Sequence, residues 1–153
     1  MRVAVGTDHA GFPLKDAALD VIGAMGHDVV DCGAAAVIPE DDYPDYAQRV
    51  AQSIQGGRAE RGVLLCGSGV GASVAANKFE GIRAALCHDT FSARQGVEDD
   101  DMNVLCLGAR VVGPALATEI IRAFLGARFS NAERHRRRVA KIQEFESPIG
   151  KTQ

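Results

Sequence analysis

Cys66, followed by a glycine-rich turn, is the part of the sequence whose residue types most directly suggest chemistry. It lies in the stretch RGVLLCGSGVGASVAANK, residues 61–78, where an apolar run ends at the cysteine. A thiol beside the N-terminus of a following helix is expected to have a lowered pKa, because that helix end carries partial positive charge. A thiolate there can attack a carbonyl carbon or remove a proton from carbon. A buried structural cysteine is the alternative interpretation.

The turn Gly67-Ser68-Gly69-Val70-Gly71 predicts an anion site. Its glycines permit close backbone approach and positive φ angles, so several N–H groups can face one point together with the helix N-terminus. A phosphate, a carboxylate or a transient oxyanion would fit, and a tight turn without a ligand is the alternative. The pattern G-x-x-x-x-G-K-[ST] of nucleoside triphosphate sites is absent. The dinucleotide pattern matches at Gly67, Gly69 and Ala72, but too little chain remains for a substrate domain.

Charged residues form three further candidate groups. Asp8 and His9 are a potential hydrogen-bonding pair. Arg134 and Arg138 are four residues apart, so they share one helix face and can clamp a phosphate; a solvated helix face is the alternative. The acids of residues 98–101 are expected to form a solvated loop, and consecutive residues rarely converge on one metal ion.

The elements that must position these residues alternate along the chain. Apolar runs predict strands at 3–6, 29–32, 62–66, 82–87 and 103–108. Between and after them, helices are predicted from Pro13 to Gly26 and at 46–54, 70–78, 114–125 and 132–146, with one or two helical turns at 90–95. Continuously apolar strands are typical of a parallel sheet covered on both faces. The expected fold class is α/β, a three-layer α/β/α sandwich, Rossmann-like, with a five-stranded parallel sheet.

Ligands of such sheets bind outside the carboxyl ends of the strands, which gives a usable list of candidates. These are Thr7, Asp8 and His9 after the first strand, Cys66 after the third, His88 and Asp89 after the fourth, and Arg110 after the fifth. Polar and reactive residues are therefore expected to gather at one sheet edge.

Chain length, net charge, apolar content and cysteine spacing limit the classes of protein to which this chain can belong. The chain of 153 residues is long enough for one domain, expected over residues 1–153 with a flexible tail at 147–153. A net charge of −3 and a short basic cluster without aromatic residues argue against nucleic-acid binding. No apolar run has the length of a membrane span, so a cytoplasmic protein is expected. The four cysteines show no metal-site spacing, which favours reduced thiols.

Taken in order, several motifs resemble the ribose-5-phosphate isomerase type B family, which includes galactose-6-phosphate and allose-6-phosphate isomerases. They are TDHAGFPLK at 7–15, YPD at 43–45, LCGSGVGASVAANK at 65–78, GIRAALCHDTFSA at 81–93, NVLCLGARVVG at 103–113 and RHRRRV at 134–139. The resemblance covers residues 2–142, nearly the whole chain.

The resemblance implies an aldose–ketose isomerase of a small phosphosugar that uses neither a metal nor an organic cofactor. Cys66 would move a proton between C2 and C1 of ribose 5-phosphate, Ser68 would help to move the hydroxyl proton, and the backbone of residues 67–71 would hold the enediolate. The family forms homodimers, or dimers of dimers, with shared active sites. The substrate-binding residues implied are Asp8, His9, Tyr43, Gly67, Gly69, Val70, Gly71, Asp100, Arg110, Arg134, His135 and Arg138. A non-catalytic phosphosugar-binding module is the alternative outside enzymology.

One pair of residues departs from the family pattern. The family usually carries a histidine and then an asparagine shortly before the NVL strand, and the histidine is linked with opening the sugar ring. This chain has Asp99 and Asp100 there. Asp99 could act as the ring-opening acid–base if its pKa were raised. Alternatively, His135 or His9 takes over that role, or the substrate is another aldose phosphate, such as a tetrose phosphate that forms no stable ring.

Overall fold

Five strands form one parallel sheet in the computed structural model, which describes residues 1–146. They are β1 (Arg2–Thr7), β2 (Asp28–Asp31), β3 (Arg61–Cys66), β4 (Ala84–Leu86) and β5 (Val104–Gly108), in the spatial order β2-β1-β3-β5-β4. The chain adds β2 on one side of β1 and then returns to place β3 on the other side. The strand order therefore reverses between β1 and β3, which is where ligands bind in open α/β sheets.

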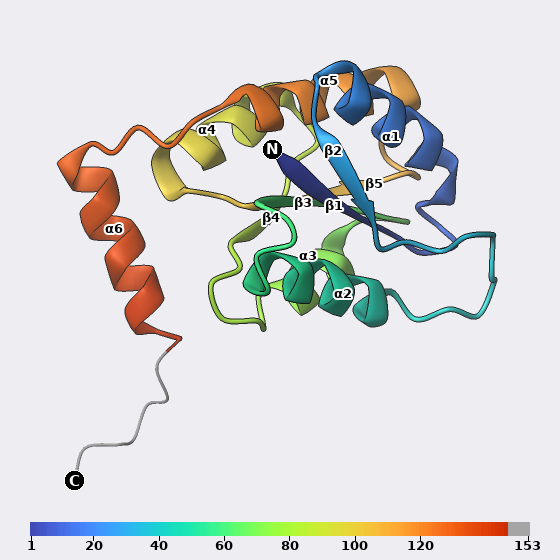
Figure 1. Ribbon diagram of the computed structural model, residues 1–153, viewed down its shortest axis with the longest axis horizontal. Helices are drawn as coiled ribbons and strands as arrows, with labels where there is room; N and C mark the ends of the chain where they lie inside the picture. Colours follow the sequence, from blue (N-terminus) through green and yellow to red (C-terminus); the bar gives the residue numbers. More distant parts are fainter. Residues whose placement is uncertain (147–153) are drawn as a thin grey trace, which may run out of the picture.

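Helices cover both faces of the sheet (Figure 1). One layer contains α1 (Lys15–Ala24), which follows the short 3-10 helix η1 (Phe12–Leu14), together with α4 (Thr90–Asp100) and α5 (Pro114–Gly126). The other layer contains α2 (Tyr43–Gln55) and α3 (Val70–Ala76). Separate apolar clusters fill the two interfaces between sheet and helices. The predicted three-layer α/β/α sandwich with a five-stranded parallel sheet is confirmed.

The last helix, α6 (Glu133–Glu144), stands outside the three layers and contacts α4 (Figure 1). His135 and Val139 are its buried residues, and the arginines around them are exposed. The predicted tail at 147–153 lies outside the described residues. Within residues 1–146, no helix is long and apolar enough to cross a membrane.

Helix α4 is longer than the sequence indicated, and it corrects the expectation of an acidic loop. Asp89 caps its first turn by accepting the backbone N–H of Ser92 at 2.6 Å. Glu98, Asp99 and Asp100 belong to its last turn, and Asp101 ends it with a φ of 51°. Two side-chain pairs four residues apart stabilise this part of the helix: Arg94 donates to Glu98 at 3.0 Å, and Gln95 donates to Asp99 at 2.7 Å. The four acids are therefore spread around a helix end.

Candidate active site

Cys66 and Asp8 meet where the strand order reverses. Asp8 follows β1 and Cys66 ends β3, and these strands are neighbours in the sheet. The Sγ–H of Cys66 donates to Oδ2 of Asp8 at 3.0 Å, and the other carboxylate oxygen accepts the backbone N–H of Gly11 at 2.8 Å. Both side chains are buried, at 9% and 3% exposure. The structure thus provides a thiol–carboxylate pair at the predicted sheet edge.

The pKa of Cys66 moves in the opposite direction from the sequence-based expectation. Burial of the thiol, followed by its hydrogen bond to Asp8 and the charge of that carboxylate, raises this pKa to about 11. The backbone N–H groups of Gly67 and Gly69 favour the thiolate but do not outweigh these causes. The prediction of a lowered pKa was therefore wrong. The resting pair at neutral pH is a thiol bonded to a carboxylate.

The glycine turn packs closely against the neighbouring strands β4 and β5. Gly69 has a φ of 80°, a left-handed conformation that glycine adopts without strain, and it is the N-cap residue of α3. A Cβ there would lie 2.7 Å from Leu86 and 3.0 Å from the backbone of Leu107. Ser68 and Val70 are exposed at the tip of the turn, where the hydroxyl of Ser68 accepts the N–H of Val70 at 3.3 Å. The backbone N–H groups of this turn therefore have a fixed position beside Cys66.

Two of the predicted substrate-binding side chains lie over this turn. The ring of Tyr43, the first residue of α2, lies against Gly71, and the guanidinium of Arg110 lies against Gly67. The backbone N–H of Arg110 donates to the carbonyl of Gly67 at 3.0 Å, which ties the end of β5 to the turn. We define the strand-end site as Cys66, Ser68, Asp8, His9, Tyr43, Arg110 and the turn 67–71. The structure brings all of these predicted residues to one edge.

Asp41 belongs to this edge but was not predicted. Both oxygens of its carboxylate accept the backbone N–H of His9, Oδ1 at 3.2 Å and Oδ2 at 3.1 Å. Oδ1 also lies 2.6 Å from Nδ1 of the same histidine. Burial opposes ionisation of Asp41, but the hydrogen bonds from His9 and Tyr46 outweigh it and hold the pKa of the carboxyl below its usual value. The loop at 34–43 contains three acids, and nothing in its sequence singles out this one. Asp41 fixes the orientation of the His9 ring.

A cation could in principle be held by this group. Asp8, His9 and Asp41 each offer one potential ligand atom, and these atoms lie within 4.8 Å of one another. Each of the three is already engaged in the hydrogen bonds described above, which account for their convergence without an ion.

The remaining predicted residues form a second group at the other edge. Asp99 and Asp100 end α4 shortly before β5 begins at Val104, whereas Cys66 pairs with Gly108 at the far end of that strand. Four residues of strand separate these levels by about 13 Å. Asp99 of α4 and His135 of α6 meet where the two helices contact each other, and Arg134 and Arg138 also belong to α6. We call these four residues the helix-end cluster. Within one chain, the structure does not bring this cluster to Cys66.

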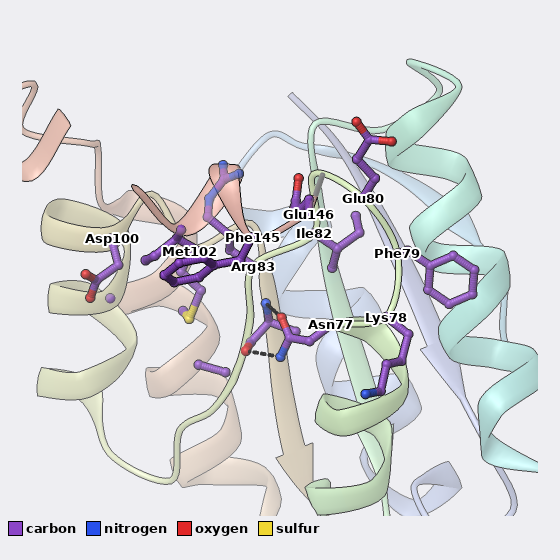
Figure 2. Close-up of a pocket in the computed structure, with 14 residues that line it drawn as sticks. Asn77, Lys78, Phe79, Glu80, Ile82, Arg83, Asp100, Met102, Phe145 and Glu146 are labelled. Carbon is purple, nitrogen blue, oxygen red and sulfur yellow. Dashed lines mark hydrogen bonds between the residues drawn. The ribbon is translucent and has the colours of Figure 1, made fainter. Parts of the chain in front are cut away.

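A cavity of about 610 Å³ also lies away from the strand-end site. Figure 2 shows its lining, which includes Phe79, Ile82, Met102 and Phe145, with Asp100 at one side. None of the predicted catalytic residues lines it. Its wall is mainly apolar. Asp100 is the one predicted substrate-binding residue among those that line this cavity.

Comparison with known proteins decides the family. The model of the family described as "Ribose/Galactose Isomerase" matches residues 3–142. The chain belongs to this family. Its activity is accordingly that of an isomerase that interconverts aldose and ketose sugar phosphates.

Individual relatives cover nearly the full length. The chain is 43% identical to ribose-5-phosphate isomerase B of Escherichia coli, over 95% of this chain and 96% of the relative. It is also 43% identical to D-erythrulose-4-phosphate isomerase of Pectobacterium atrosepticum, over 84% of this chain and 85% of the relative. The solved structure of ribose-5-phosphate isomerase B from Clostridium thermocellum superposes with a TM-score of 0.91 at 42% identity, covering 95% and 97% of the two chains.

Proposed function

We propose that this isomerase interconverts D-ribose 5-phosphate and D-ribulose 5-phosphate through an enediolate. The observation that carries the proposal is the thiol–carboxylate pair of Cys66 and Asp8 beside a turn with fixed backbone N–H groups. Proton transfer between neighbouring carbons needs a base next to the carbon and donors where negative charge develops. The names of the Escherichia coli and Clostridium thermocellum relatives support this substrate.

The raised pKa of Cys66 determines how the base must work. Cys66 is protonated at rest, so its proton first moves along the 3.0 Å hydrogen bond to Oδ2 of Asp8. The thiolate then takes the proton from C2, and the electron pair of that C–H bond forms the C1=C2 double bond. Cys66 returns the proton to C1, which leaves the ketose. Asp8 holds the first proton while Cys66 carries the second between the two carbons, and the thiolate recovers its proton from Asp8 after the transfer to C1.

Negative charge develops on O1 as the enediolate forms. The backbone N–H groups of Gly67 and Gly69 lie near Sγ of Cys66, where they favour its thiolate, and they would stabilise this oxygen without reorganisation. The hydroxyl of Ser68 is exposed at the same turn and would carry the proton between O1 and O2. His9, held by Asp41, and Tyr43 would contact the sugar hydroxyls.

The phosphate requires residues from two edges of the molecule. Arg110 belongs to the strand-end site, but Arg134 and Arg138 lie on α6 in the helix-end cluster. We propose that the protein forms a homodimer, or a dimer of dimers, in which the helix-end cluster of one subunit completes the strand-end site of the other.

Mixing Cys66→Ser protein with Arg138→Ala protein tests this, because hybrid dimers would recover one complete site. If the protein sediments as a monomer under conditions in which it is fully active, the proposal of a shared site is contradicted.

A tetrose phosphate is the second candidate substrate, and the environment of Asp99 favours it. Asp99 accepts from Gln95 at 2.7 Å and lies 3.4 Å from Nδ1 of His135, so its carboxylate is engaged rather than free for ring opening. A five-membered aldose ring closes through the hydroxyl on C4, which carries the phosphate in a tetrose 4-phosphate. Such a substrate is always open. The Pectobacterium atrosepticum relative is named for this class of substrate.

Measuring kcat/KM on D-ribose 5-phosphate, D-erythrulose 4-phosphate and D-allose 6-phosphate separates the candidates. A clear preference for the pentose supports the first proposal, and a clear preference for the tetrose replaces it with the second. Asp99→Asn sharpens the result. If Asp99 opens rings, this variant loses kcat on the pentose and keeps it on the tetrose. Asp99→His should raise pentose turnover if a missing ring-opening group limits it.

We expect no metal or organic cofactor in this reaction, because the chain's own residues supply the base and the donors. Dialysis against EDTA should therefore leave kcat unchanged. Loss of activity that a divalent cation restores would contradict this and would direct attention to Asp8, His9 and Asp41.

A further inference from the structure

His135 occupies an unusual place in the helix-end cluster. It lies in the first turn of α6 among exposed arginines, yet its side chain is buried, with 4% exposure of the residue. Both ring nitrogens have partners. Nδ1 lies 2.7 Å from Oγ of Ser130 and 3.4 Å from Oδ1 of Asp99, and Nε2 lies 3.0 Å from Nε of Arg134. No ring nitrogen is left to contact a substrate.

These contacts determine which nitrogen carries the proton. The Nε–H of Arg134 can only donate, so Nε2 of His135 must be the acceptor. The neutral ring then carries its proton on Nδ1, and this proton faces the hydroxyl oxygen of Ser130 and the carboxylate of Asp99. Ser130 suits the acceptor role, because its Oγ also accepts the N–H of Ala132 at 3.3 Å. The hydrogen bonds run in one direction, from Arg134 through His135 to Ser130 and Asp99.

On the basis of the phosphate-binding role proposed for Arg134, we propose that His135 is a positioning residue that orients this arginine. The acceptor at Nε2 fixes Nε–H and with it the plane of the guanidinium. The two terminal nitrogens of Arg134 then remain for a bidentate contact with the phosphate. Without this acceptor the long side chain would have to be ordered when the substrate binds, at a cost in affinity.

Asp99 anchors this arrangement to the body of the protein. Its carboxylate joins Gln95 of α4 to the ring of His135 on α6, so it links the orientation of the ring to the last turn of α4. Asp99 is thus assigned to the support of Arg134. Because Arg134 would hold the phosphate equally in the ground state and the transition state, the expected effect is on KM rather than on kcat.

Two substitutions of His135 test the roles of its two ring nitrogens separately. The amide of His135→Asn reaches the position of Nδ1 and keeps a donor toward Ser130, but it offers nothing at Nε2. The longer His135→Gln reaches the position of Nε2 and can present its oxygen to Arg134. We expect His135→Asn to raise KM, and the inhibition constant of inorganic phosphate, by about tenfold, the effect of one charge-assisted hydrogen bond. Its kcat should stay within about twofold, and His135→Gln should recover most of the lost affinity.

Arg134→Lys provides a second variant at an exposed position, which keeps the charge but has no Nε–H for His135 to hold. We expect a similar loss of phosphate affinity. The positioning role is overturned if Arg134→Lys binds phosphate as the unmodified protein does. It is also overturned if His135→Asn and His135→Gln, both folded by circular dichroism, weaken phosphate binding equally or not at all. If Arg134→Ala leaves phosphate inhibition unchanged, the proposed phosphate-binding role of Arg134 fails instead.

Discussion

The strand-end site and the helix-end cluster are built in different ways. At the strand ends, Cys66 and Asp8 emerge from neighbouring buried strands, and the turn beside them is fixed by backbone hydrogen bonds and by Gly69. In the helix-end cluster, Asp99 and His135 meet through side chains that project from two helices. The first region positions its groups through the sheet. The second positions them through a chain of side-chain hydrogen bonds.

This difference assigns different work to the two regions. Proton transfer needs groups held within a few tenths of an ångström, which a parallel sheet provides. Holding a phosphate needs charge and orientation, which long side chains provide once another residue orders them. Changes to Cys66 and Asp8 at the strand ends should therefore reduce kcat, and changes in the helix-end cluster should mainly raise KM.

The largest effect is expected from Cys66→Ser. A serine hydroxyl is a far weaker base than a thiolate, so kcat should fall by about 10²–10⁴-fold, the usual contribution of general acid–base catalysis. Cys32→Ser is the matched control, because its Sγ faces Ser53 at 3.4 Å instead of Asp8. Turnover measured with a coupled assay should be lost only in the first variant. Near-normal turnover of Cys66→Ser would remove the cysteine from the mechanism.

Asp8→Asn should change catalysis and thiol reactivity in opposite directions. Burial and the Asp8 carboxylate raise the pKa of Cys66 to about 11, and removing the negative charge lowers this pKa. More thiolate is then present at pH 8, so alkylation of Cys66 by iodoacetamide should become faster. Isomerase kcat should fall by about 10²-fold, because the partner that accepts the thiol proton is lost. A variant that gains thiol reactivity and keeps kcat would show that Asp8 only restrains the cysteine.

Gly69→Ala tests whether the turn is as rigid as its contacts indicate. An alanine there has an unfavourable φ of 80° and a Cβ 2.7 Å from Leu86, so unfolding should need about 1–3 kcal/mol less. Gly113→Ala is the control, since its φ is −83° and no described atom lies within 4 Å of the added Cβ. Urea unfolding should separate the two variants. Equal midpoints would mean that the turn yields easily.

Asp41→Asn should have the smallest effect. It keeps an oxygen that can accept from His9 but removes the charge, so KM should rise by about three- to tenfold. Because the folded-state pKa of Asp41 is lowered, its ionised form contributes stability above the usual pKa, and that contribution is lost as the pH falls through the lowered value. Unfolding experiments at pH 7 and pH 2 should show a larger difference from the unmodified protein at pH 7 than at pH 2. An equal difference at both values would assign the effect to packing.

Sequence patterns predicted the strand-end site well, because its positions follow from strand order. The apolar runs ending at Gly6 and Cys66 placed both ends at one edge, and the structure confirms their contact through Asp8. The pKa of Cys66 was predicted in the wrong direction, since the sequence reveals a helix N-terminus but neither burial nor the direction of a carboxylate. Asp41 lies in an aperiodic loop and gave no signal.

The helix-end cluster was less accessible to prediction. The acids 98–101 appeared to be a loop because charge runs usually are solvated, and the polar pairs of Gln95 with Asp99 and of Arg94 with Glu98 that continue the helix became evident only in the structure. The sequence placed Arg134 and Arg138 on one helix face. It could not indicate that His135, between exposed arginines, turns inward to meet Asp99.

Gly11 gives the two regions different freedom to diversify. Any side chain at this position would overlap the backbone of Leu65 and approach Cys66, so the loop after β1 and the end of β3 are interlocked. A side chain at position 11 must therefore displace the loop after β1 and the end of β3 together, whereas an exchange at Asp99 alters only side chains at a helix end. New substrates in this lineage are accordingly expected to arise by substitutions at the helix ends, while the proton-transfer chemistry is inherited unchanged.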